Sequence, residues 1–395
     1  MAPRDTGSYT QHNCATVLVT GTEYFARMEA LIDGARGNVH LQVYIFADDA
    51  IGGRIGNALV RAAQRGVQVF LLVDGYASQD ISAGLVERLR VAGGNFRWFQ
   101  PLMSSRRFYI GRRMHHKVLV VDHRHALVSG RNIAHRYTDT DGRPAWYDMA
   151  LDVEGEVAMD LARLCCSVWN GTIPRAQRKR AVPPTDEDRR ALLRHWPEGE
   201  RCAVRVRFND WLFGHARITA SYMEMFREAR TEIHLMASYF VPGRKLKRAM
   251  AAAAHRGVRV RVIIAGRSDV WIAKPAERWL YAWLLRNGIE VFEYQKSVLH
   301  AKVAVRDGEW ATVGSFNLND LSAYTTLEVN LDVYDPRLAG RIHEGLQRMA
   351  PEDRRHITDL DERRIGMLDK LGRWLAYRTL RLMHGLLTFY YRQER

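Results

Sequence analysis

Apolar residues follow two alternating spacings along the chain, and the same order of spacings occurs twice. In the first half, apolar residues at helical spacing predict helices over 24–35, 51–65 and 81–91. Runs rich in β-branched and aromatic residues predict strands over 39–46, 67–74 and 95–99. The same patterns return in the second half, where they predict helices over 222–230, 245–255 and 276–285. The matching strands are expected over 232–240, 258–265 and 289–294.

This alternation predicts an α/β protein built from βαβ units, with a mostly parallel sheet in each half. Gly66 and Gly257 follow matching helices and are typical helix C-caps. A repeat of this size indicates two similar domains related by a pseudo-two-fold axis. We expect these domains over 15–170 and 204–350, a linker rich in Pro, Arg, Asp and Glu over 171–203, and a C-terminal tail over 351–395.

The repeat carries a polar motif at the same place in each half. Residues 115–122 and 300–307 both read H-x-K-x-x-x-x-D, and the motif residues are His115, Lys117 and Asp122, then His300, Lys302 and Asp307. Each motif is followed by a turn of small residues that contains an asparagine, Asn132 in the first half and Asn317 in the second. Two copies with matching turns are far more specific than one copy would be.

The motif residues suit phosphoryl transfer. Residues i and i+2 of a strand share a face, so the His and Lys of each motif are expected to point the same way. If the halves meet, two His and two Lys converge on one pocket at the interface. The lysines would bind a phosphoryl group, one His would attack phosphorus, and the other would act as acid and base. Because the lysines supply positive charge, we expect no metal and no cofactor.

Other residues near the motifs are candidates for supporting roles. Asp122 and Asp307 complete the catalytic motif, but their odd spacing from Lys turns them away from the pocket, which favours a structural role. Asp148 and Glu328 follow the two motifs at like positions and could fix a His tautomer, with a surface salt bridge as the rival interpretation. Asn132, Asn317 and the backbone of the turns, including Ser315, could donate to the phosphate.

Composition narrows the choice of partner and compartment. The 395 residues carry a formal net charge of +15, which favours an anionic partner: nucleic acid, a membrane surface or a phosphate-bearing substrate. The four cysteines lack paired spacing, which favours a reducing compartment over a disulfide framework. We expect a soluble or peripheral protein, since no run approaches the roughly 20 apolar residues of a membrane-spanning helix.

The duplicated H-x-K-x4-D motif with its trailing Gly, Ser and Asn resembles the phospholipase D superfamily over about residues 15–350. The resemblance implies two phospholipase D-type α/β/α domains that share one active site at their interface and react by double displacement through a phosphohistidine. It makes His115 the nucleophile and His300 the acid and base, or the reverse. The first turn, Ser129-Gly130, departs from the usual Gly-Gly or Gly-Ser, which leaves its backbone details open.

Several short sequence segments are similar to those of bacterial cardiolipin synthases. The similarity is greatest to the B type, which lacks the two N-terminal membrane helices that other members carry. The similar segments lie at 128–133, 146–148, 238–242 and 314–318. This resemblance implies a phosphatidyltransferase that uses phosphatidylglycerol and lies peripherally on the cytoplasmic side of the cell membrane. It leaves the oligomeric state open.

Three alternatives have the same motif residues: a phospholipase D that releases phosphatidic acid, a nuclease, and a membrane-binding scaffold with a dead site. The intact His and Lys pairs argue against the scaffold.

The tail indicates a membrane partner independently. Placed on a helical wheel, its apolar residues fall on one side, namely Leu368, Leu371, Leu375, Leu382, Leu386 and Phe389. Lys370, Arg373 and Arg381 fall on the opposite side. This pattern is typical of a helix lying in an anionic interface, whereas a nucleic-acid groove combines basic residues with stacking aromatics. We therefore expect an anionic phospholipid surface and no nucleic acid as partner. The alternative is a helix docked on the core of the protein itself.

Overall fold

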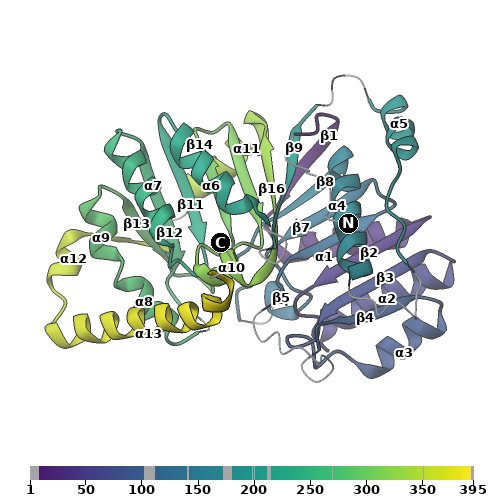
Figure 1. Cartoon of the computed structure of the whole chain (residues 1–395), viewed down its shortest axis with the longest axis horizontal. Helices are drawn as coiled ribbons and strands as arrows, with labels where there is room; N and C mark the ends of the chain where they lie inside the picture. The colour runs from purple at the N-terminus through teal and green to yellow at the C-terminus, as the bar shows by residue number, and fades with distance from the viewer. Residues whose placement is uncertain are drawn as a thin grey trace.

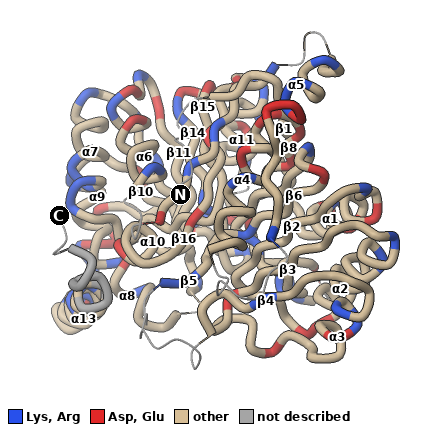
Figure 2. The backbone as a smooth tube through the Cα atoms, turned by 45° about the vertical axis from the view of Figure 1, so that its right-hand side comes forward, with Lys and Arg blue, Asp and Glu red and all other residues tan. Residues whose placement is uncertain are grey.

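The computed structural model describes residues 9–101, 112–139, 142–171, 180–197, 199, 201–210, 215–268, 270–349 and 351–392. Two sheets lie side by side with helices on both faces, and a long C-terminal helix runs beneath the second half (Figure 1). Lys and Arg are interspersed with Asp and Glu over both halves (Figure 2).

The first half contains β1 (Asn13–Leu18), α1 (Gly21–Gly34), β2 (Asn38–Val43), α2 (Ala50–Gln64), β3 (Gln68–Asp74), α3 (Ala83–Val91), β4 (Asn95–Phe99), β5 (Arg113–Met114), β6 (Lys117–Val121), β7 (His125–Ser129), β8 (Ala150–Gly155) and α4 (Glu156–Gly171). Between the halves lies α5 (Asp186–Arg194). The second half contains β9 (Ala203–Asp210), β10 (His215–Ala216), α6 (Arg217–Glu228), β11 (Glu232–Ala237), α7 (Arg244–His255), β12 (Arg259–Ala265), α8 (Ala273–Arg278), α9 (Tyr281–Arg286), β13 (Glu290–Tyr294), β14 (Val303–Arg306), β15 (Trp310–Gly314), α10 (Asp320–Tyr324), β16 (Thr326–Tyr334) and α11 (Pro336–Gln347). The tail contains β17 (Arg354–Ile357), α12 (Asp359–Arg363) and α13 (Met367–Arg392).

The two sheets have the same strand order, which confirms the predicted duplication. The first runs β1-β8-β7-β6-β2-β3-β4, and the second contains β9-β16-β15-β14-β11-β12-β13. The expectation of mostly parallel sheets is wrong. Only β2-β3-β4 and β11-β12-β13 pair in parallel, while the other neighbours in these two runs are antiparallel. Short turns join β6 to β7 and β14 to β15, which permits only antiparallel pairing there, while the pairs β1-β8, β2-β6, β11-β14 and β9-β16 join strands far apart in the chain.

Most predicted elements lie within a few residues of the observed ones. Gly66 and Gly257 have φ of +87° and +90°, the left-handed conformation that ends a helix at glycine. The helix expected over 276–285 is two short helices, α8 and α9. They are separated by a tight turn in which the Leu280 N–H bonds to the Glu277 carbonyl three residues back. In the tail, a 3-10 helix (Pro351–Asp353) precedes β17, which extends the second sheet beside β13 and was not predicted.

One apolar core runs across both halves. The inner faces of the two sheets, with α4 and α11, contribute to a single cluster that includes Val118 and Leu151 from the first half and Val206 and Leu331 from the second. Separate clusters fill the outer faces under α1–α3 and under α6, α7 and α9. Because the shared core joins the sheets, residues at their junction are held in a fixed relation to each other.

Candidate active site

Each motif histidine is held by the backbone of the opposite half. The His115 N–H donates to the Leu327 carbonyl at 2.9 Å, where β5 runs parallel to the start of β16. The His300 N–H donates to the Tyr147 carbonyl at 2.7 Å. In both cases the residue after the acceptor is one of the predicted acids, Glu328 or Asp148. The backbone pairing therefore brings each histidine beside an acid of the other half.

The side chains form two crossed pairs. His115 Nδ1 lies 2.9 Å from Glu328 Oε1, and His300 Nδ1 lies 2.7 Å from Asp148 Oδ2. Both carboxylates are fully buried, so these are not surface salt bridges. A carboxylate on Nδ1 keeps the proton on that nitrogen and leaves the lone pair on Nε2. The carboxylates thus favour the tautomer with a free Nε2 in both histidines, while at His300 the Lys302 Nζ also lies 3.1 Å from Nδ1.

The two motif lysines are buried next to their histidines. Lys117 Nζ donates to the His115 carbonyl, and Lys302 Nζ donates to the His300 carbonyl and to Ser238 Oγ at 2.8 Å. The expectation that each His-x-Lys lies within a regular strand is wrong, because β6 starts only at Lys117 and β14 starts after Lys302. In each motif the lysine ammonium group donates to the backbone carbonyl of the histidine two residues earlier, near the start of the strand.

Hydroxyl groups fix the Glu328 carboxylate. Ser315 Oγ donates to Oε2 at 2.5 Å, and Thr326 Oγ1 donates to Oε1 at 2.8 Å. Ser315 was expected to act through the backbone of its turn, so its side-chain role was missed, as was Thr326. The signal for Thr326 was its i−2 position to Glu328 on a strand, which places both side chains on one face.

Asp148 is held by a glycine turn and the local backbone. The Met149 N–H donates to Oδ1 at 2.7 Å, and the buried guanidinium of Arg131 donates to the Asp148 carbonyl. A Cβ at Gly130 would lie 2.6 Å from Asp148 Oδ2, so the position has no room for a side chain. In the Ser129-Gly130 turn, the glycine therefore leaves room for the Asp148 carboxylate to pack against the backbone.

The two asparagines lie in the turns near the histidines. Asn132 Oδ1 accepts from the Ile45 N–H at 3.1 Å, and its amide donates to the Tyr137 hydroxyl at 3.2 Å. Asn317 is buried, and its Oδ1 has no partner among the described residues. The donation of either amide to a phosphate stays a prediction.

Asp122 and Asp307 lie away from the histidines and have equivalent structural contacts. Asp122 accepts the N–H groups of residues 36, 37 and 38 at 2.7–2.9 Å, at the start of β2. Asp307 accepts those of residues 230, 231 and 232 at 2.9–3.0 Å, at the start of β11. Both have φ of +52°. Neither contacts a motif histidine in these bonds, so we assign both to the structure of the motif rather than to its chemistry.

Burial governs the ionisation of the bases. Desolvation lowers the pKa of His115 and, with the charges of Lys302 and Lys117, lowers that of His300 further, so both imidazoles are neutral at neutral pH. Desolvation also lowers the pKa of Lys117 to about 7, opposed by Glu328 and reinforced by Lys302. These mutual effects link both motifs in one electrostatic unit.

The two acids differ in ionisation. Burial raises the pKa of Glu328, but the opposing effects of His115, Lys117 and the Ser315 hydroxyl are larger in sum, so the net pKa is lowered. Burial raises the pKa of Asp148 to about 6 despite Lys302 and Arg131. Glu328 therefore holds a firm negative charge at neutral pH, whereas Asp148 lies closer to its titration point.

Comparison with known proteins identifies the family. A family model described as "Cardiolipin synthase, PLD-like domain" matches residues 28–143 and 222–350, which together are more than half of the chain. The chain belongs to this family. Members of the phospholipase D superfamily have this duplicated architecture, and the fold class predicted from the sequence is confirmed. The chain is an enzyme of the phosphatidyltransferase kind.

Individual relatives agree with this assignment. Cardiolipin synthase B of Salmonella typhimurium is 33% identical, over 95% of this chain and 88% of its own length. Cardiolipin synthase B of Escherichia coli K12 is 31% identical, over 97% of this chain and 90% of its own. The crystal structure of phosphatidylserine synthase from Haemophilus influenzae matches the fold with a TM-score of 0.71 at 15% identity, over 97% of both chains. In the described part of this chain, every helix is too short or too polar to cross a membrane.

Proposed function

We propose that the chain makes cardiolipin by transferring a phosphatidyl group from one phosphatidylglycerol to the hydroxyl of another through a phosphohistidine. The crossed His–carboxylate pairs carry this proposal, since they supply two neutral imidazoles with free Nε2 atoms beside two lysines. One imidazole serves as nucleophile and the other as acid and base.

In the first step, His115 Nε2 attacks the phosphorus of the donor lipid and the bond from phosphorus to the glycerol oxygen breaks. We assign the nucleophile to His115 because its partner, Glu328, stays ionised and stabilises the positive charge that develops on the imidazole. The first turnover starts from the fraction of His300 that is protonated, which gives its proton to the leaving oxygen so that glycerol departs; each later turnover uses the proton that His300 takes from the acceptor hydroxyl. Lys117 and Lys302 bind the non-bridging oxygens, on which charge accumulates.

In the second step, neutral His300 removes the proton from the hydroxyl of a second phosphatidylglycerol. That oxygen attacks phosphorus, the bond from phosphorus to nitrogen breaks, and cardiolipin leaves with His115 neutral again. Asp148 suits this alternation, because a carboxyl group with a pKa of about 6 can follow the changing charge of His300 near neutral pH.

The test uses purified protein and vesicles of phosphatidylglycerol labelled with ³²P, with lipid products resolved by mass spectrometry. Wild type should form cardiolipin and free glycerol, and His115→Ala and His300→Ala should both lose at least about 10²-fold in rate. Acid-labile, base-stable label on the protein should appear with wild type and be absent from His115→Ala. The control is His356→Ala, an exposed histidine on β17.

Phosphatidic acid as the sole product would replace the transferase with a phospholipase. Label on His115→Ala but none on His300→Ala would reverse the two histidines.

We also propose that α13 binds the cytoplasmic surface of an anionic membrane. Its outward side carries an apolar stripe among polar residues: the exposed apolar side chains include Met367, Leu368, Leu371, Trp374, Leu375, Leu382 and Met383. Its inward face carries arginines, since Arg381 pairs with Asp320 at 2.9 Å and Arg373 pairs with Glu362 at 3.0 Å. The helix is therefore docked on the protein, as the alternative interpretation stated, but with its apolar stripe turned outward. The side chains of Leu386 and Phe389 lie outside the described residues.

The surroundings of α13 favour lipid over another occupant. The exposed Lys370 and Arg378 lie on the same helix as the apolar stripe, which is the arrangement of an interfacial helix on anionic lipid. Trp271, 84% exposed, lies just before α8, and α8 packs along α13. Trp residues are favoured at the level of lipid headgroups. None of the four cysteines, all of which the structure describes, forms a disulfide, which agrees with the cytoplasmic side.

Sedimentation with phosphatidylglycerol vesicles tests this surface. The double variant Leu371→Ser, Leu375→Ser should bind at least about 10-fold more weakly, because both side chains are about half exposed and would lose burial in lipid. Val91→Ser on α3, 80% exposed in the first half, is the matched control and should bind as wild type does. Equal binding by the double variant and wild type would refute the role of α13.

A further inference from the structure

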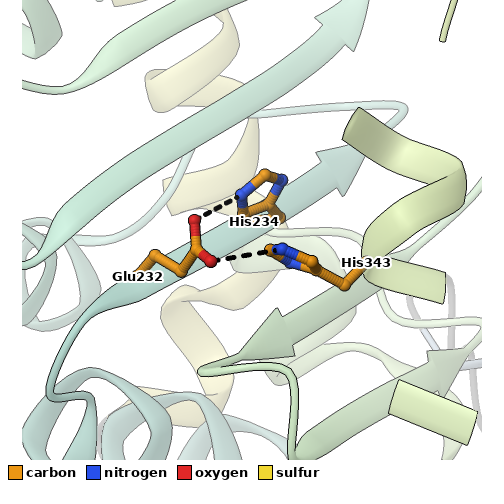
Figure 3. A group of neighbouring side chains, drawn as sticks. All are labelled: Glu232, His234 and His343. Atoms are coloured by element: carbon orange, nitrogen blue, oxygen red, sulfur yellow. Dashed lines mark hydrogen bonds and ion pairs between the residues drawn. The ribbon is translucent and has the colours of Figure 1, made fainter. Parts of the chain in front are cut away.

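Two histidines and a glutamate meet at the end of β11 that lies farthest from the catalytic residues. Glu232 and His234 are two residues apart on β11 and share a face, and His343 reaches them from α11 (Figure 3). The other end of β11 leads to Ser238, which contacts Lys302. The cluster is therefore separate from the active site, although the same strand connects the two.

The two carboxylate–imidazole distances fit a transition metal. Glu232 Oε2 lies 3.2 Å from His234 Nε2, and Glu232 Oε1 lies 3.2 Å from His343 Nε2. One ligand atom from each of the three residues lies within 4.8 Å of the others. Tetrahedral Zn²⁺ with bonds of about 2.0–2.1 Å separates its ligands by roughly 3.3 Å. Two imidazoles and one carboxylate form a ligand set that selects zinc over magnesium or calcium, which prefer oxygen.

The hydrogen bonds of the cluster also favour a cation. The Gln347 amide nitrogen lies 2.8 Å from His343 Nε2, so with the amide oriented in this way Nε2 carries a lone pair. A cation bound there would replace the Gln347 amide at that lone pair and would also attract Glu232 Oε1, which lies 3.2 Å from His343 Nε2. The nearby Arg261 does not oppose this, because its charge is paired with Glu290 at 2.8 Å.

We propose that Glu232, His234 and His343 form a Zn²⁺ site with water as fourth ligand, which joins α11 to the start of β11. The side chains of Glu232 and His343 are 23% and 15% exposed, so an ion and a water molecule have access, while His234 is buried. The site goes beyond the proposed function and does not depend on it. Its effect is on stability, since it fixes a helix to a sheet strand in the second half.

The test uses the full chain, stripped with chelator and then given one equivalent of ZnCl₂ before gel filtration. Wild type should retain about one zinc per chain by elemental analysis, and excess zinc should raise Tm by roughly 5 °C. Cobalt in place of zinc should give the visible absorption of a tetrahedral site. His343→Ala and the isosteric Glu232→Gln should each reduce retained zinc at least about 10-fold.

Two controls separate this site from other zinc-binding groups. His356→Ala removes an exposed histidine outside the cluster, and His115→Ala removes a histidine of the active site. Both should retain zinc as wild type does. Absence of zinc from the wild type, or full retention by folded Glu232→Gln, would overturn the proposal. Loss of zinc in His115→Ala would place the ion at the catalytic residues and overturn it equally.

Discussion

Replacing Glu328 with Gln is the sharpest test of how the histidine pairs work. The substitution keeps the size of the side chain and removes its charge. Glu328 accepts from His115 Nδ1 at 2.9 Å, from Ser315 at 2.5 Å and from Thr326 at 2.8 Å. A glutamine offers one oxygen where the carboxylate offers two. Its amide nitrogen can face Nδ1 of His115, and it then donates to that nitrogen instead of accepting from it.

That reversal moves the proton of His115 to Nε2, where the attack on phosphorus should occur. In a histidine–carboxylate pair, the corresponding substitution lowers turnover about 10⁴-fold because the wrong tautomer is favoured. We expect Glu328→Gln to lower turnover by about 10³–10⁴-fold, which corresponds to about 4–5.5 kcal/mol in the transition state. Stability should change by only about 2 kcal/mol or less, because Lys117, with a pKa of about 7, can lose its proton as the acid is neutralised.

The assay follows cardiolipin formation at steady state and protein-bound ³²P in the first turnover. If Glu328 serves the nucleophile, Glu328→Gln should lose the rapid labelling of the protein as well as the steady-state rate. Glu309→Gln is the matched control, since Glu309 is exposed and accepts a hydroxyl bond from Tyr334 at 3.1 Å. More than a tenth of wild-type turnover in folded Glu328→Gln would refute the reasoning.

The other predictions concern stability, pH and geometry. Burial raises the pKa of Asp148 from 3.8 to about 6. The free energy of unfolding is therefore highest below about pH 4, where the carboxyl is protonated in both states, and falls by roughly 3 kcal/mol as the pH rises from about 4 through 6. Asp148→Asn should raise Tm at pH 8 but not at pH 4, as measured by calorimetry. The value of kcat/KM for phosphatidylglycerol should fall above about pH 7 as Lys117 loses its charge, and a flat profile to pH 9 would contradict this. Gly130→Ala should lower kcat about 10²-fold, because its Cβ would displace the Asp148 carboxylate 2.6 Å away; crystallography of the variant would show the shift. Asp122→Ala should lower the free energy of unfolding by about 2 kcal/mol in urea titrations, because three backbone N–H groups lose their acceptor.

The sequence indicated the repeat and the chemistry because both depend on local patterns. The spacing of apolar residues marked the units around β2–β4 and β11–β13, where successive elements are neighbours in space. The antiparallel part of each sheet was not predicted, since β1 pairs with β8 and β9 pairs with β16 across long stretches of chain, and such pairing leaves no periodic pattern in the sequence. The pairing of His115 with Glu328 could likewise not be predicted from residue spacing, because the two residues are 213 positions apart in the sequence.

The orientation of α13 shows a different limit of sequence reasoning. A helical wheel separates apolar from basic residues, but it does not say which side faces the protein. Arg373 and Arg381 face inward because they form ion pairs with Glu362 and Asp320. These two acids lie in other elements, α12 and α10. The side chain of Lys370, which the wheel groups with the arginines, is exposed instead.

The crossed pairing also constrains how the two halves could have diverged after duplication. Each half holds one histidine and the acid that serves the other half's histidine. Under the proposed mechanism, a substitution of Asp148 would harm the chemistry of His300, and one of Glu328 would harm that of His115. If that mechanism holds, neither copy could acquire a new role while the other kept the reaction, because each copy supplies the acid for the other's histidine.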